Sequence, residues 1–183
     1  MAGHRVASLK SESGFTLIDL LFVCSIIGLL STLAIPGLMR ARGVAQSASA
    51  VGTLRVINSA QLSFAVTCGS GFYAPDLPTL GVKPPSAFQA FLPPDLTTSA
   101  SLVKSGYTIS LSGTSLPGAP ASCNGLAAGL GAPGYTAIAD PLDPIGNPHF
   151  YATNADGTIY EDSTSLAGTL PESGPSPRGT AIK

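Results

Sequence analysis

The sequence predicts an α+β fold in which one long N-terminal helix packs on a small antiparallel sheet. Three observations support this prediction. Residues 15–36 form an apolar run, residues 37–67 carry a helical apolar stripe, and residues 68–162 combine Gly- and Pro-rich loops with short alternating segments. The tail at 163–183 is polar and Pro-rich, and we expect it to be loosely ordered.

The N-terminal segment has the features of a membrane-crossing helix. Residues 1–14 are polar and carry Arg5 and Lys10, while residues 15–36 span roughly 30 Å as a helix, enough to cross a bilayer core. Because positive charge favours the cytoplasmic side, we expect the N-terminus to stay in the cytoplasm and the rest to cross. The run is apolar apart from a few residues: Thr16, Asp19, Ser25, Ser31 and Thr32.

Three interpretations of this run compete. A secretory signal would be cleaved at a small-x-small site such as the one at residues 32–34, and a plain anchor would simply stay in the bilayer. Neither explains Asp19, because an acid within hydrocarbon costs a few kcal/mol and is usually functional. The third interpretation is a segment that is cleaved before the apolar run and in which Asp19 has a function.

The run GFTLIDLL (14–21) resembles the leader site of type IV pilins and of the related type II secretion pseudopilins. The resemblance covers residues 1 to about 40. It implies that 1–14 is a leader peptide, that a prepilin peptidase cleaves after Gly14, and that the same enzyme N-methylates Phe15. Asp19 then takes the fifth mature position, where the family usually has Glu, and Pro36 the twenty-second.

This resemblance also implies a pilin-like form of the predicted fold and a function in assembly. Asp19 would attract the N-terminal amine of an incoming copy and set the axial register of a homo-oligomeric helical filament. The pilus assembly machinery would polymerise the chain from the inner membrane into an extracellular pilus that serves adhesion or motility. Two alternatives remain: a periplasmic pseudopilin of a type II secretion system, and a membrane-anchored binding module that does not polymerise.

Residues 37–67 are predicted to continue the helix as its amphipathic half. Pro36 removes a backbone donor and clashes with the preceding turn, so we expect a kink there. Asn58 and Gln61 interrupt the apolar stripe. At about 100° per residue, the stripe has these members: Val44, Ala50, Val51, Leu54, Ile57, Leu62, Phe64 and Ala65.

The three cysteines differ in their surroundings. Cys24 lies in the apolar run, where a thiol behaves as a small apolar residue. Cys68 ends the long helix and Cys123 lies in a Gly/Pro-rich loop, both in the part expected to cross the membrane, where disulfides persist. A Cys68–Cys123 bond would contribute about 2–4 kcal/mol, and two free thiols are the alternative.

The domain after Cys68 is predicted to contain three or four strands. Residues 69–100 suggest a long loop with one short helix at 86–91. The runs GYTISL (106–111) and GYTAIA (134–139) alternate as strands do, and 148–161 suggests a hairpin with a left-handed Gly in its turn.

The remaining composition does not favour an enzyme. The formal net charge is −1 and only 10 % of residues are charged, so no basic face indicates nucleic acid. His149 stands beside Pro148 and suits a structural or exposed role. We therefore expect no catalytic residue, no cofactor and no metal. The acids that could attract a cation lack calcium-loop spacing: Asp140, Asp143, Asp156, Glu161 and Asp162.

Overall fold

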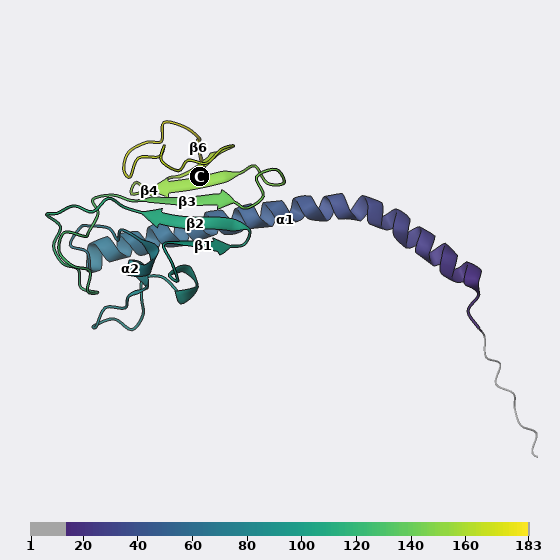
Figure 1. Cartoon of the computed structure of the whole chain (residues 1–183), viewed down its shortest axis with the longest axis horizontal. Coiled ribbons are helices and arrows are strands. Elements are labelled where there is room, and N and C mark those ends of the chain that lie inside the picture. The colour runs from purple at the N-terminus through teal and green to yellow at the C-terminus, as the bar shows by residue number, and fades with distance from the viewer. Residues whose placement is uncertain (1–13, 183) are drawn as a thin grey trace, which may run out of the picture. The chain divides into compact units, whose positions relative to one another are not determined.

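The computed structural model describes residues 14–182 and contains one long helix, α1, from Leu17–Thr67. Residues 1–13, which hold almost all of the expected leader, lie outside the described part. The chain divides into two compact units, Met1–Ala41 and Arg42–Lys183, which are described separately. Figure 1 shows the elements of both.

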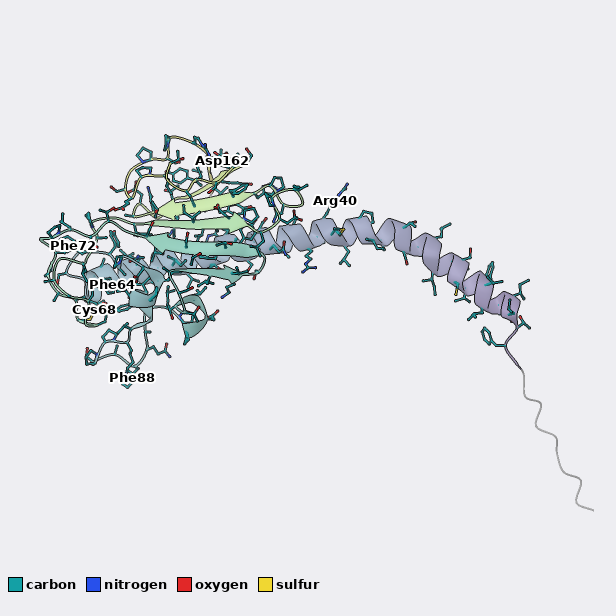
Figure 2. The ribbon with its side chains drawn as sticks, in the orientation of Figure 1. Arg40, Phe64, Cys68, Phe72, Phe88 and Asp162 are labelled. Atoms are coloured by element: carbon teal, nitrogen blue, oxygen red, sulfur yellow. A yellow bond between two sulfur atoms is a disulfide. The ribbon has the colours of Figure 1, made fainter. Side chains whose placement is uncertain are left out.

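In the first unit, helix α1 leaves its apolar side chains uncovered. No residue of the most apolar stretch is buried, and the helix is long and apolar enough to cross a membrane. Figure 2 shows the side chains of this part standing out from the ribbon. Helix α1 continues through Pro36; the expected kink stays a prediction.

The second unit is built on a six-stranded antiparallel sheet with the strand order β1-β2-β3-β4-β5-β6. Each strand therefore pairs with its neighbour in sequence. Short turns connect β1 to β2 and β4 to β5, whereas long segments connect β2 to β3 and β5 to β6. The strands are β1 (Ser101–Lys104), β2 (Tyr107–Ser112), β3 (Thr136–Pro141), β4 (Phe150–Asn154), β5 (Ile159–Asp162) and β6 (Thr180–Ile182).

One sheet face packs on the C-terminal part of α1, as the apolar stripe predicts. Ile109 pairs with Ala139, and Ala139 with Tyr151, so these side chains share a face. They join Leu54 and Phe64 of the helix in one buried cluster. Two members of the predicted stripe, Val44 and Leu62, are instead exposed.

The opposite sheet face carries a second, smaller core that the sequence analysis missed. Ile138, Ala152 and Tyr160 lie on this face and contact Leu166 and Leu170. The tail expected to be loosely ordered is thus partly buried, and β6 pairs with β5 along the sheet edge. The expectation for 163–183 was wrong because its apolar residues are few and their partners lie far away in sequence.

The sheet has six strands instead of three or four. Strand β1 was missed because it is short and half exposed, although it joins β2 by a two-residue turn. Ser105 and Gly106 both have positive φ, 50° and 80°, which is the conformation that twists a tight hairpin correctly. Gly157 has φ 75°, so the β4–β5 turn contains the left-handed glycine that the sequence predicted.

The prediction of a short helix at 86–91 is wrong. Helix α2 lies earlier, at Leu77–Gly81, and a 3-10 turn, η1, lies later, at Pro94–Leu96. Asp76 caps α2 by accepting the Thr79 amide (2.9 Å), which is the usual chemistry of a helix start. Both elements exist because they bury leucines: Leu77, Leu80 and Leu96.

Candidate functional site

The start of helix α1 is organised by a reciprocal pair of hydrogen bonds. The Asp19 amide donates to Thr16 Oγ1 (3.3 Å), and the Thr16 amide donates to Asp19 Oδ2 (3.2 Å). The Thr16 hydroxyl also donates to Asp19 Oδ2 (2.5 Å). This is a capping box, in which a Thr before the helix and an acid three residues later satisfy two free amides. Asp19 therefore has a local structural role.

The residues just before this capping box are open to solvent. Phe15 is 82 % exposed, and among the described residues nothing approaches within 4 Å of the position of a Cβ on Gly14. The Gly14–Phe15 peptide bond precedes the first helical turn, since α1 begins at Leu17. A protease could reach this bond without unfolding the helix.

Two polar side chains in the apolar part of α1 find a partner within the helix. Ser31 Oγ donates to the Ile27 carbonyl (2.8 Å), and Thr32 Oγ1 donates to the Leu29 carbonyl (2.8 Å). In hydrocarbon a polar group needs such an internal partner, because water is absent. Cys24 is a free, exposed thiol. This part of the helix is thus suited to lipid or to apolar helices.

A disulfide joins Cys68 to Cys123, across a sequence separation of 55 residues. The Cα atoms lie 4.8 Å apart, and the Cys123 amide also donates to the Cys68 carbonyl (3.1 Å). The structure therefore contains the pairing considered in the sequence analysis, with Cys24 left over. The bond ties the end of α1 to the long β2–β3 connection.

A buried hydroxyl fixes the sheet to the beginning of the helix in the second unit. Tyr107 Oη donates to the His149 carbonyl (2.9 Å), accepts from Asn147 Nδ2 (3.0 Å) and lies 3.0 Å from Ser47 Oγ. Asn147 Nδ2 also reaches the Gly43 carbonyl (3.3 Å). Burial raises the pKa of the Tyr107 hydroxyl, whereas its bonds to Ser47 and Asn147 lower it. The hydroxyl therefore stays neutral and holds the loop after β3 beside α1.

Gln61, expected to interrupt the apolar stripe, is fully buried. Its Nε2 donates to the Ala74 carbonyl (2.8 Å) and its Oε1 accepts the Ala74 amide (2.9 Å). A buried amide pair of this kind satisfies both groups of an irregular segment. Gln61 thus belongs to the core and joins α1 to the chain that leads into α2.

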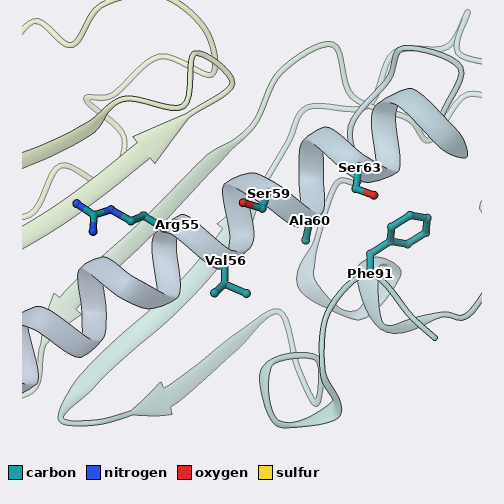
Figure 3. A pocket seen from close by; sticks show the side chains of 6 residues that line it. All are labelled: Arg55, Val56, Ser59, Ala60, Ser63 and Phe91. Carbon is teal, nitrogen blue, oxygen red and sulfur yellow. The ribbon is translucent and has the colours of Figure 1, made fainter. Parts of the chain in front are cut away.

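A shallow groove of about 350 Å³ runs along the exposed side of α1 in the second unit. We call it the α1 groove. Figure 3 shows Arg55 near one end and Phe91 near the other. Its floor is made of small and aliphatic side chains from the helix: Val56, Ser59, Ala60 and Ser63.

Within residues 14–182 no group of three or more His, Cys, Asp or Glu side chains is close enough to hold a metal ion. One buried acid atom lacks a partner: Asp140 Oδ1, while Oδ2 of the same carboxylate accepts Ser165 Oγ (2.7 Å). Burial raises the pKa of Asp140 and the bond from Ser165 lowers it. Asp140 lies in strand β3 of the second unit.

The predicted site residues fall into two groups in the structure. Gly14, Phe15 and Asp19 lie together at the start of α1, whereas Cys68 and Cys123 lie in the second unit. Sequence reasoning missed Thr16, although Thr-x-x-Asp before an apolar run is the signal of a capping box. Comparisons with family models, curated proteins and solved structures give no match.

Proposed function

We propose that this chain is the precursor of a type IV pilin-like filament subunit. A prepilin peptidase cleaves it after Gly14 and N-methylates Phe15, and the mature chain polymerises through its apolar helix. Before assembly the subunit crosses the inner membrane once, and after assembly it belongs to a filament outside that membrane.

One observation carries the proposal: an accessible Gly14–Phe15 bond directly precedes a capped, uncovered apolar helix that bears a single acid in its first turn. A plain anchor could use Asp19 as a helix cap but needs no Gly–Phe junction before it. Cleavage would place a new cationic amine on Phe15, about one helical turn from Asp19. In an apolar filament core a carboxylate needs such a partner, because an unpaired buried charge is costly.

The capping box makes the two roles of Asp19 separable by mutation. Asp19→Asn keeps an oxygen that can accept the Thr16 amide but removes the charge. Thr16→Ala removes the hydroxyl partner and keeps the charge. Asp19→Glu keeps both features and has the residue usual in the resembling family.

The test is the yield of surface filaments sheared from cells that produce each variant with a prepilin peptidase and its assembly machinery. If the charge sets the register, Asp19→Asn and Asp19→Ala are cleaved but give few or no filaments, while Asp19→Glu and Thr16→Ala give nearly normal yields. Normal filaments from Asp19→Ala would remove the charge-pairing argument. No filament from the wild type would refute polymerisation, and filaments confined to the periplasm would favour the pseudopilin alternative.

A further inference from the structure

We infer that the loop after β3, residues 142–146, docks into the α1 groove of a second copy of this chain, with Asp143 of one copy paired to Arg55 of the other. This inference rests on the proposed function, because it names the contact through which copies stack outside the membrane. It follows from the exposure, charge and placement of the two surfaces within the second unit.

The loop presents aliphatic side chains next to an acid. Ile145 is 95 % exposed and Leu142 is 58 % exposed, although both adjoin a well-packed sheet. Asp143 is exposed, and its one described bond is from the Gly146 amide to Oδ1 (3.0 Å). Within residues 14–182 this carboxylate forms no salt bridge. A single exposed aliphatic residue needs no explanation, but two on one loop beside an unpaired acid indicate a contact.

The α1 groove offers the complementary features. Phe91 provides an apolar wall, Val56 an apolar part of the floor and Arg55 a cation, while the small serines leave room for a side chain. Across the described residues, Arg55 has no acidic partner within the chain. An Arg beside apolar surface is typical of interface centres.

The other grooves fit this loop less well. A groove lined by Leu62, Tyr73 and Tyr135 also contains Asp156, which would repel Asp143. A groove beside Phe88 contains Lys83 and is the rival site. The rival site consists of loop residues and Pro94 of η1, whereas most of the α1 groove belongs to the helix, so Lys83 provides the matched control.

A chain cannot place this loop in its own groove. Asn147 holds the loop against Gly43 and Ser47 of α1. At about 100° per residue, Val56 lies about 180° around the helix from Ser47, on the opposite side. The groove centre, near Ser59, is also about 18 Å further along the helix than Ser47. The occupant must therefore belong to another copy.

The same offset determines the kind of assembly. Two parallel copies joined by this contact are staggered by about 18 Å along the helix, and the loop of the second copy is free to bind a third. A contact between two different surfaces that does not close gives an open helical filament. The contact thus generates a polymer, which a symmetric dimer contact would not do.

Charge reversal tests the pairing in sheared filaments. Arg55→Glu and Asp143→Arg each place like charges in the contact and should lower the filament yield about tenfold, equivalent to about 1.4 kcal/mol per contact. The double variant, Arg55→Glu with Asp143→Arg, restores the opposite charges and should recover the yield. Lys83→Glu should leave the yield unchanged. Unaltered unfolding temperatures of the full-length variants would show that the exposed substitutions do not disturb the fold.

Disulfide trapping tests the geometry directly. Cells produce two tagged copies that both carry Cys24→Ser, one with Ser59→Cys and the other with Ile145→Cys, and mild oxidation should link the two tags only when both substitutions are present. If every variant forms filaments but the two tagged copies are never linked, the proposed contact is wrong and the proposed function stands. The contact would also be wrong if the double charge variant did not recover the filament yield. The same holds if Ile145→Cys formed its disulfide with Lys83→Cys and not with Ser59→Cys. Absence of wild-type filaments would refute the proposed function and, with it, this contact.

Discussion

The two parts of helix α1 use similar residues in opposite ways. In the part up to Ala41, the leucines and isoleucines whose side chains are described are exposed, whereas after Arg42 the helix buries Leu54, Ile57 and Phe64 under the sheet. The second part is stabilised by its own domain, as soluble helices are. The first part is long and apolar enough to cross a membrane, and exposed apolar surface of this extent is unfavourable in water.

Removing a core side chain of the second unit should have the largest effect on stability. Phe64 is fully buried and packs edge-to-face on Phe91, with 5.3 Å between ring centroids. Phe64→Ala should lower the free energy of unfolding by about 3–5 kcal/mol. Denaturant unfolding of the full chain in detergent measures this. Leu20→Ala is the matched control and should have almost no effect, since Leu20 is uncovered.

Breaking the Cys68–Cys123 disulfide should have the next largest effect. Cys123→Ser should lower the stability of the second unit by about 2–4 kcal/mol, since it removes a constraint on the unfolded chain. Thermal unfolding with and without reductant measures the effect. Reductant should destabilise the wild type and leave Cys123→Ser unchanged. A wild type insensitive to reductant would contradict the prediction.

A charge introduced into the first part of α1 should weaken membrane insertion and leave the stability of the second unit unchanged. Leu29→Arg should cost about 2.5–3.5 kcal/mol of membrane insertion if it lies near the bilayer centre. Alkaline extraction of membranes should then release more of the chain, while the unfolding of the second unit stays the same. A Leu29→Arg chain that remains fully membrane-bound would show that this part does not span the bilayer.

Gln61 tests whether a polar residue in the buried stripe is part of the core. Gln61→Leu keeps the size but leaves the amide and carbonyl of Ala74 without their partner. The expected loss is about 2 kcal/mol in the free energy of unfolding, since unpaired buried polar groups are costly. An unchanged or higher stability would mean that water replaces the side chain.

The smallest expected effect is the pH dependence from Asp140. Burial raises the pKa of this acid in the folded state above 3.8. Below pH 3.8 it is protonated in both states and has no effect, and as pH rises through the folded pKa its ionisation destabilises the fold. Asp140→Asn should therefore raise the unfolding temperature at pH 7 and leave it unchanged at pH 3. A higher unfolding temperature of Asp140→Asn at pH 3 but not at pH 7 would contradict this prediction.

Local patterns made helix α1 and the β4–β5 hairpin predictable. The apolar run, the stripe and Gly157 all act over a few residues, and the structure contains the features they predict. Strand β6 and the burial of Leu166 were not predictable, because their partners lie elsewhere in the sheet. The α1 groove depends on Phe91, which reaches the helix only after α2 has turned the chain. Non-local packing of this kind leaves no periodic signal in the sequence.

The intact mass of the subunit in sheared filaments tests directly whether the chain is processed and polymerised. We expect a chain that begins at Phe15, carries one added methyl group and contains one disulfide. A mass for the full precursor, or for a chain that begins after Ala34, would contradict it, as would the absence of the chain from the sheared fraction.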